Sequence, residues 1–225
     1  MSVKIVVIAT AAVAAGILIG NGAAGAAVTR GLAETGPHGA WYASRAAGIA
    51  SYLFLWLGLV GGLLMSSAWF DGILSRARLL ALHQTAAIAG VLLGLAHALV
   101  LIPDGWTRFG LFDVLVPFGS YYERWLTGIG TLALYLSGVV SVSFWFRKRI
   151  GMRAWRYLHY GSFASFAGAF WHGLSVGTDS RSTWLMTVYL ATTLAVVFGV
   201  MLRITYRRAA VRRSNVPVRP EAQAA

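Results

Sequence analysis

The sequence predicts an all-α integral membrane protein, a helical bundle with six transmembrane helices. Hydrophobic residues make up 58% of the 225 residues and charged residues only 12%. The mean hydropathy is +0.68, a composition outside the range of soluble domains. Six long apolar runs follow one another, and they lack the alternation over about ten residues that marks a membrane β-barrel. Because hydrocarbon leaves backbone groups without water, helices are the expected spanning structure.

Each run is long enough to cross a bilayer, which takes about 20 residues of helix. The predicted spans are 4–28, 41–67, 78–102, 124–146, 154–177 and 183–206. The first span has two interpretations. The apolar run Ile5–Ile19, followed by small residues, is consistent with a cleaved signal peptide. Gly16 and Gly20 form a small-xxx-small pair and favour a retained helix, which we prefer. Residues 1–206 thus form one transmembrane domain, and 207–225 form a basic cytoplasmic tail that is expected to be disordered.

Positive charges are divided unequally between the two sides of this bundle. One side has fourteen Lys and Arg residues: Lys4, Arg76, Arg78, Arg147, Lys148, Arg149, Arg153, Arg156, Arg203, Arg207, Arg208, Arg212, Arg213 and Arg219. The other side has five: Arg30, Arg45, Arg108, Arg124 and Arg181. Short cytoplasmic loops hold the excess of Lys and Arg, so both termini are expected in the cytoplasm and the protein in the inner (plasma) membrane. We therefore interpret these basic residues as topology signals. We expect membrane lipid as a partner and no nucleic acid.

Four of the five histidines lie inside the apolar runs as two pairs. His83 and His97 are 14 residues apart in the third run, and His159 and His172 are 13 apart in the fifth. A histidine in hydrocarbon is costly and usually functional, and imidazole is a common ligand of iron. At 1.5 Å per residue, the two levels are roughly 20 Å apart. The pairs therefore predict two haems held between the third and fifth helices, one near each membrane surface.

Helical phase supports the two pairs unequally. A step of 14 returns to within about 40° of the same face, whereas a step of 13 misses it by about 140°. The fifth helix is therefore expected to contain a π-bulge, or the haems approach it from different sides. Gly90 and Phe166 are further candidate cofactor-binding residues. Gly90 would let a flat macrocycle or a neighbouring helix approach, and Phe166 would lie between the haems; ordinary packing is the alternative for both.

Other kinds of site lack the residues they need. A carboxylate-bridged di-iron centre requires Glu-x-x-His motifs, and the sequence has none. All seven acidic residues fall outside the spans or at their ends, so a proton path through buried carboxylates is not predicted. With no cysteine in the chain, disulfides and iron–sulfur clusters are excluded.

A single buried histidine often makes only an interhelical hydrogen bond, and His38 is expected to be exposed and inert. On the inner side, Arg76, Arg78, Arg153 and Arg156 are topology charges or partners of haem propionates.

Two segments resemble the third and fifth helices of the ferric reductase-like transmembrane domain: LLALHQTAAIAGVLLGLAHALVLIP and WRYLHYGSFASFAGAFWHGLSVGTD. This domain is shared by ferric reductases, NADPH oxidases and the haem-binding membrane subunit of the bacterial periplasmic methionine sulfoxide reductase system. The resemblance covers roughly residues 41–206. It implies two b-type haems, with His83 opposite His159 and His97 opposite His172, and electron flow from the inner to the outer side.

Ferric reductases and NADPH oxidases carry a flavin and nicotinamide domain after the sixth helix, and here no Gly-x-Gly-x-x-Gly fingerprint follows a strand. We therefore expect electrons from a separate cytoplasmic flavoprotein, from membrane quinol or from a loosely bound flavin, and an external acceptor that the sequence does not identify. The hypothesis is a di-haem b-type cytochrome, an oxidoreductase component with ferric reductase activity as a candidate. Its alternatives are a non-haem transporter or assembly factor that uses the histidines for packing or transition-metal binding, and a regulatory remnant that conducts no electrons.

Overall fold

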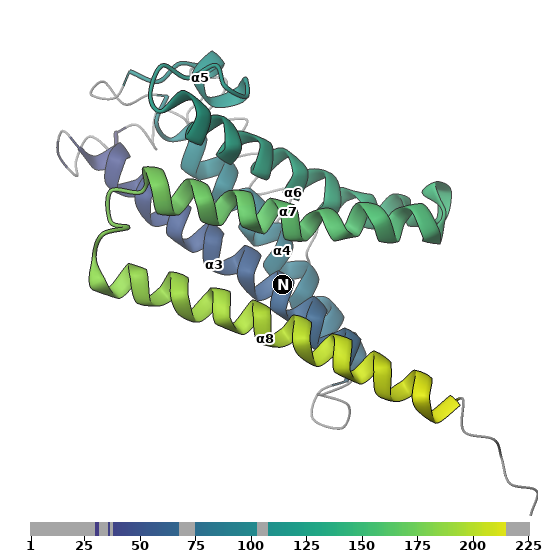
Figure 1. The fold of residues 1–225 in the computed structure, drawn as a ribbon. Helices are drawn as coiled ribbons and strands as arrows, with labels where there is room; N and C mark the ends of the chain where they lie inside the picture. The colour runs from purple at the N-terminus through teal and green to yellow at the C-terminus, as the bar shows by residue number, and fades with distance from the viewer. Residues whose placement is uncertain (1–29, 32–35, 37, 68–74, 103–107, 215–225) are drawn as a thin grey trace, which may run out of the picture.

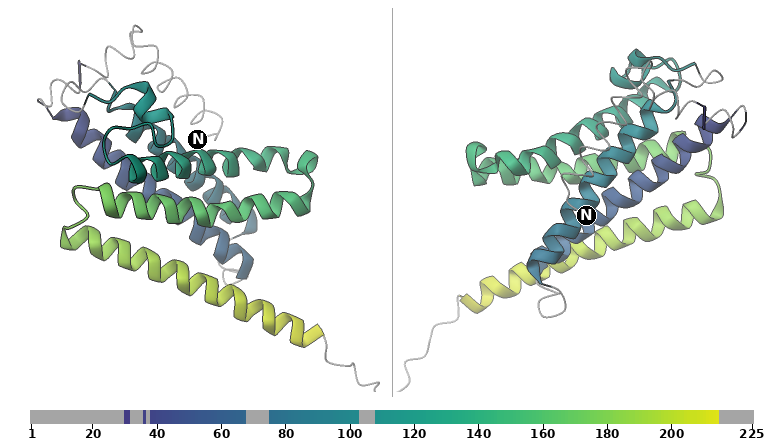
Figure 2. Two further views of the ribbon diagram at one scale, coloured as in Figure 1. Left: turned by 45° about the horizontal axis from the view of Figure 1, so that its top comes forward. Right: turned by 180° about the vertical axis from the view of Figure 1, so that it is seen from behind.

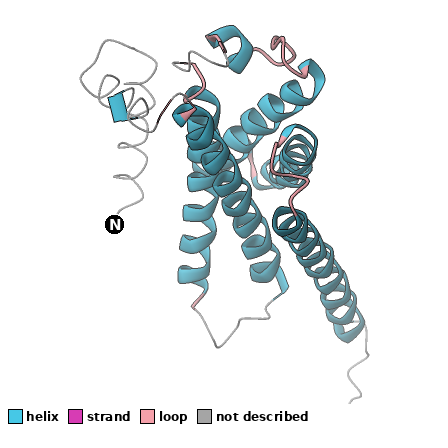
Figure 3. Ribbon diagram, turned by 90° about the vertical axis from the view of Figure 1, so that its left-hand side faces the viewer, coloured by secondary structure: helices cyan, strands magenta, loops and turns pink. Residues whose placement is uncertain are grey.

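The computed structural model describes residues 30–31, 36, 38–67, 75–102 and 108–214, and this part of the chain contains helices and no strands (Figure 3). The helices are α3 (Gly39–Ser67), α4 (Arg76–Leu99), α5 (Leu111–Leu115), α6 (Arg124–Ile150), α7 (Met152–Val176) and α8 (Thr183–Ser214). The predicted all-α class is confirmed for these residues. The predicted first span, 4–28, lies outside them.

Four of these helices are long and apolar enough to cross a bilayer: Gly39–Ser66, Arg76–Leu99, Arg124–Ile150 and Thr183–Tyr206. Such helices indicate a membrane protein, as the composition predicted. The predicted span 154–177 forms as α7, but its histidines, serines and glycines make it less apolar than the other four. Helix α8 extends through Ser214, beyond the predicted limit at 206, because the Arg and Ala residues that follow are good helix formers. This differs from the disorder expected from residue 207 on.

The long helices form two antiparallel hairpins and a single helix beside them. Helices α3 and α4 make the first hairpin, and α6 and α7 lie side by side as the second (Figures 1 and 2). Gly151 alone separates α6 from α7, and its φ of 89° lies in the left-handed region that glycine enters without strain. Helix α8 packs along α3. We call the end with Gly151 the inner end and the end with α5 the outer end, following the predicted orientation.

Small residues allow α3 and α4 to approach closely. A Cβ atom added at Gly90 of α4 would lie 2.8 Å from Cγ of Leu55, and one added at Gly58 of α3 would lie 3.4 Å from the backbone N of Ala87. Ser51 Oγ donates to the carbonyl oxygen of Gly90 at 2.7 Å. Between apolar helices in lipid, such close packing and interhelical hydrogen bonds take the place of the hydrophobic effect.

The contact between α3, α7 and α8 is an aromatic cluster. Tyr52 of α3 stacks on Phe166 of α7 with ring centres 5.3 Å apart, and its ring meets that of Tyr189 edge-on at 5.1 Å. The Tyr52 hydroxyl lies 2.6 Å from Oγ1 of Thr192, so its buried polar atom has a partner. Trp56 Nε1 donates to the Thr192 carbonyl at 3.1 Å. These bonds hold α8 against the outer half of α3.

Residues 108–123 form a segment that covers the outer end of the bundle. Phe109 and Val114 of this segment pack in one apolar cluster with Leu99 and Leu101, at the end of α4. Within the described residues, every non-glycine residue with positive φ lies here: Arg108, Phe118 and Glu123. Such conformations persist only where surrounding contacts enforce them, so the packing onto α4 and α6 determines the path of this segment.

We predict that Gly90→Ala destabilises the bundle. The new Cβ would meet Leu55 both at Cγ and at its backbone N, 3.0 Å away, and a backbone atom cannot yield cheaply. Overpacking of this kind costs about 1–3 kcal/mol, measurable as a lower midpoint of thermal unfolding in detergent.

Gly138→Ala on α6 is the matched control, because nothing lies within 4 Å of its added Cβ. Alanine is favoured over glycine in a helix by up to about 1 kcal/mol, so this variant should be as stable as the parent or slightly more stable. Equal midpoints for the two variants would contradict the close contact at Gly90.

Candidate functional site

The four histidines of α4 and α7 face one another as two pairs between the hairpins. His83 of α4 and His159 of α7 have ring centres 6.0 Å apart, and their planes are inclined at 69°. His97 of α4 and His172 of α7 have ring centres 6.2 Å apart at 73°. The first pair lies toward the inner end and the second toward the outer end. The structure thus brings together the same two pairs that the resemblance implies.

The spacing within each pair suits one metal ion between two imidazoles. Metal–imidazole bonds are about 2.0–2.1 Å long and each nitrogen lies about 1.2 Å from the centre of its ring, so a shared ion would place the ring centres roughly 6.4 Å apart. The separations of 6.0 and 6.2 Å are close to this value. A direct hydrogen bond between the two rings is not required to explain either contact.

Three of the four rings are oriented by a backbone carbonyl of a neighbouring helix. The bonds are His83 Nδ1 to Gly58 O (2.7 Å), His97 Nδ1 to Ser44 O (2.8 Å) and His172 Nδ1 to Leu126 O (2.9 Å). A carbonyl oxygen only accepts, so Nδ1 carries the proton and Nε2 keeps its lone pair. Within the described residues no hydrogen bond occupies these Nε2 atoms. A metal-ligating histidine typically has this tautomer, and its other ring nitrogen typically donates a hydrogen bond that fixes the orientation of the ring.

A glycine accompanies each of these carbonyls, four residues further along the same helix. The pairs of carbonyl and glycine are Gly58 and Gly62, Ser44 and Gly48, and Leu126 and Gly130. Side chains in a helix lean toward its N-terminus and cover the preceding turn, so a side chain at the glycine would cover the carbonyl. An added Cβ would lie 2.9 Å from His97 Nδ1 at Gly48, 2.7 Å from His172 Nδ1 at Gly130, and 3.3 Å from His83 Cε1 at Gly62. The glycines therefore expose the carbonyls to the histidine rings.

The sequence analysis missed Gly48, Gly62 and Gly130. They lie on helices other than those of the histidines they contact, so spacing along the sequence does not connect them to the site. The sequence did contain one signal for them: each is a glycine of the predicted second or fourth span that lies at the same depth as a histidine of another span. Such glycines are common in membrane helices, which makes that signal weak.

His159 is held differently from the other three histidines. Its ring stacks on that of Trp155, one turn earlier on α7, with centres 5.0 Å apart and planes inclined at 24°. Both His159 Nδ1 and Trp155 Nε1 are buried without a hydrogen-bond partner in the described part of the chain. The inner pair therefore has one imidazole fixed by a carbonyl and one fixed by stacking.

Each pair lines a cavity bounded by α3, α4, α6 and α7, and residues of α8 contribute to both linings. The inner cavity has a volume of about 820 Å³, within the range of roughly 300–1,000 Å³ typical of ligand sites. The outer cavity is smaller, about 220 Å³, and residues of the segment 108–123 contribute to its lining. Its volume is below the range typical of ligand sites. The inner cavity also contains Arg156 and Arg203 among its lining residues.

Helix α7 presents both histidines without a π-bulge. It is an unbroken α-helix from Met152 to Val176, so the first of the two predicted explanations of its phase is wrong. The two histidines point in directions about 140° apart around the helix. The residues beside them occupy overlapping sectors of α7: Ala169, Gly173 and Val176 accompany His172, and Ser162, Phe163 and Phe166 accompany His159.

Gly90 and Phe166 occupy distinct environments. Gly90 is buried against Leu55, and its contacts are those of packing between α4 and α3; it lines neither cavity. Phe166 is 8% exposed, lines the inner cavity and stacks on Tyr52. Its position on α7, between the levels of His159 and His172, is the one that the sequence indicated.

The described residues contain no group of three or more His, Cys, Asp or Glu side chains that could hold a metal ion. Each site offers two imidazoles. A structural zinc site takes four protein ligands and a catalytic one takes three. A haem macrocycle supplies four nitrogens itself and requires only axial ligands from the protein, so the donor set and the spacing both fit this group.

We predict that Gly130→Ala impairs the outer site selectively. Its Cβ would lie 2.7 Å from His172 Nδ1 and would cover the Leu126 carbonyl, so the ring must turn away from His97. Haem titration of the purified protein should show one bis-histidine spectral component lost or weakened. Gly62→Ala, where the contact is 3.3 Å, should affect the inner site less, and Gly138→Ala should affect neither. Identical binding by the Gly130 and Gly138 variants would contradict this arrangement.

No family model, curated protein or solved structure matches the chain. The resemblance to the ferric reductase-like transmembrane domain therefore rests on the histidine segments alone, and the functional conclusion must come from the geometry of the two pairs.

Proposed function

We propose that the protein is a di-haem b-type membrane cytochrome that carries electrons across the membrane. One observation carries this proposal: the ring of His83 faces that of His159, and the ring of His97 faces that of His172. The separation within each pair is suited to one shared iron ion. A bound haem iron would supply reversible one-electron oxidation and reduction at each level. The chain's own residues would hold the haems through the two pairs of imidazoles, orient three of these rings by interhelical hydrogen bonds, and line both cavities mainly with apolar side chains.

The main alternative is a non-haem protein that uses the histidines for packing or for a transition metal. Interhelical hydrogen bonding accounts for the three Nδ1–carbonyl contacts, but it gives no reason for the rings to meet in two pairs while three Nε2 lone pairs stay without a partner in the described residues. A transition metal bound by two imidazoles would lack the three or four protein ligands of typical sites. Both observations favour haem.

We further propose that α7 crosses the membrane with the four apolar helices, giving the predicted bundle of six spans together with the first span. At 1.5 Å per residue, its 25 residues extend over roughly 37 Å, and it lies along α6. His159 and His172 would then lie near opposite membrane surfaces. Its lower hydropathy is reasonable for a helix that faces two cofactors rather than lipid.

The inner end is the proposed site of electron entry. Lys148, Arg149, Arg153 and Arg156 are exposed around the α6–α7 turn, and a basic surface attracts an acidic partner. A separate cytoplasmic flavoprotein, membrane quinol or a bound flavin would supply electrons there, and an external acceptor would take them at the outer end. By the charge rule, this end faces the cytoplasm of a plasma membrane.

We predict two haems per chain after expression with ample haem, measured by pyridine haemochrome assay. Alanine at His97 or His172 should remove the outer haem, and alanine at His83 or His159 should remove the inner one, because each iron would lose one of its two protein ligands. Because the imidazole planes are inclined at 69° and 73°, the ferric protein should show strongly anisotropic low-spin electron paramagnetic resonance signals. His38→Ala is the control, expected to retain both haems. Less than one haem per chain in the parent protein would contradict the proposal.

We predict that a reporter fused after Arg213 behaves as cytoplasmic and that one inserted after Ser180 behaves as external. The reason is the excess of Lys and Arg at the inner end. Alkaline phosphatase and green fluorescent protein fusions at both positions provide the measurement, since each reporter is active on only one side. The reverse pattern at both positions would invert the proposed direction of electron flow.

A further inference from the structure

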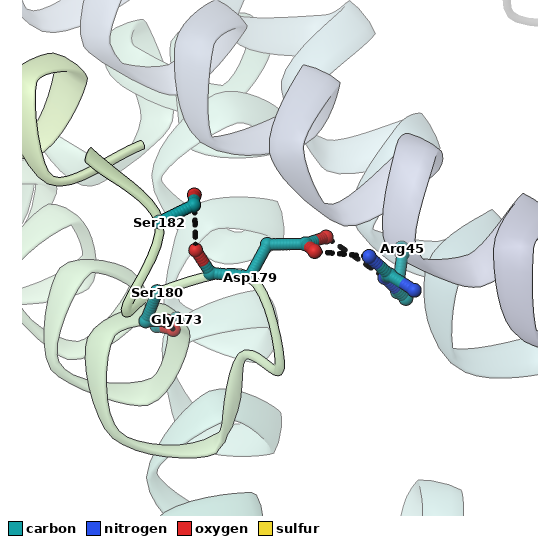
Figure 4. Close-up of polar contacts among 5 residues, drawn as sticks. All are labelled: Arg45, Gly173, Asp179, Ser180 and Ser182. Atoms are coloured by element: carbon teal, nitrogen blue, oxygen red, sulfur yellow. Dashed lines mark hydrogen bonds and ion pairs between the residues drawn. The ribbon is translucent and has the colours of Figure 1, made fainter. Parts of the chain in front are cut away.

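The outer histidine pair lies next to an ion pair that joins two separate segments. Arg45 of α3 directly follows Ser44, whose carbonyl accepts the Nδ1 proton of His97. Asp179 lies in the connection between α7 and α8, shortly after His172. Arg45 Nε donates to Asp179 Oδ2 at 2.8 Å and a second guanidinium nitrogen bonds Oδ1, so the contact is bidentate (Figure 4). Both residues line the outer cavity.

The two side chains are partly shielded from water. Arg45 is 31% exposed and Asp179 27%. Exposed ion pairs contribute little because water and salt screen them, whereas a partly buried, bidentate Arg–carboxylate contact is both stronger and geometrically specific. The pair can therefore restrain the segments it joins.

On the α7 side, the restraint continues to the residue after His172. Ser180 Oγ donates to the carbonyl of Gly173 at 2.6 Å, and Ser182 Oγ donates to the carbonyl of Asp179 at 2.5 Å (Figure 4). The connection is thus folded back onto the last turn of α7, and these bonds restrain the backbone on both sides of Asp179.

On the α3 side, the restraint continues to His97. Ser44 is 2% exposed. Its Oγ donates to the His97 carbonyl at 2.9 Å, while its own carbonyl accepts from His97 Nδ1 at 2.8 Å. These reciprocal bonds fix His97 to the first turns of α3. A continuous series of contacts therefore runs from His97 through Ser44, Arg45, Asp179 and Ser180 to the backbone beside His172.

We propose that Arg45 and Asp179 are positioning residues for the outer site, holding His97 and His172 at their mutual distance and angle. This inference rests on the proposed function only in the first test below, which measures the spectra and potentials of bound haem. The inner pair is not part of this chain of contacts, and His159 Nδ1 has no partner in the described residues. Loss of the ion pair should therefore alter the outer centre and leave the inner one unchanged.

The first test uses the haem-loaded protein in detergent and the variants Asp179→Asn, Arg45→Gln and Arg45→Lys. In electron paramagnetic resonance, the first two should shift or broaden the outer low-spin signal and leave the inner signal in place. Redox titration should move the outer midpoint potential upward in Asp179→Asn, which leaves an uncompensated cation, and downward in Arg45→Gln, which leaves an uncompensated anion. Arg45→Lys keeps the charge and loses the bidentate contact, so it should keep the potential near that of the parent but still alter the signal.

Arg181→Gln is the matched control, because it removes an exposed cation from the same connection; both signals should remain. An outer signal unchanged in both Asp179→Asn and Arg45→Gln would overturn the proposal. Equal changes at both centres, or loss of both haems, would also overturn it, because the pair would then support the fold as a whole.

The second test needs no haem and separates failure of this inference from failure of the proposed function. The chain has no cysteine, so spin labels can be attached at Ala46→Cys and Thr183→Cys, two exposed positions on either side of the ion pair. The distance distribution between the labels should be narrow in the parent and clearly broader when Asp179→Asn is added. Equal widths would overturn the inference even if two haems bind. If the parent protein fails to bind haem but Asp179→Asn still broadens the distribution, the result would support the restraint and reject the cytochrome.

Discussion

Burying an imidazole N–H in this bundle costs free energy unless the proton meets an acceptor. For three of the four paired histidines the acceptor comes from a neighbouring helix, and His159 is the exception in the described residues. An unsatisfied polar group in hydrocarbon is costly, and the carbonyls of Ser44, Gly58 and Leu126 meet this requirement for three histidines. Each carbonyl is already in a helix, so it accepts a second bond only if its surface is uncovered. The glycines at 48, 62 and 130 uncover it. The close approach of α3 to α4 and of α6 to α7 follows from these contacts as much as from general packing.

The same requirement explains why the two sites lie between hairpins. Each hairpin pairs one histidine helix with one helix that supplies carbonyls: α4 with α3, and α7 with α6. His83, His97 and His172 are thereby held against their own hairpin by Nδ1, and the opposite edge of each ring is left for the other hairpin, whereas His159 is held by stacking on Trp155. A cofactor bound between His97 and His172 would thus join the two halves of the bundle.

The two sites differ in volume and in the residues that border them. The outer one is covered by residues 108–123 and bordered by the ion pair of Arg45 and Asp179, and its cavity is about 220 Å³. The inner one is about 820 Å³, is bordered by Arg156 and Arg203, and has one histidine held by stacking on Trp155.

Hydropathy and histidine spacing, read along the sequence alone, determined the helical class, the approximate limits of the five described long helices and the two levels of histidines. These properties are local, because a helix and its apolar length depend on residues near one another in the chain. The tertiary structure decided which carbonyl meets which ring, that Gly90 packs on Leu55, and that α7 presents His159 and His172 on different sides without a π-bulge. It also decided the pairing of Arg45 with Asp179, 134 residues apart. Such contacts depend on how helices cross and rotate against one another, and that geometry arises only when the whole bundle packs.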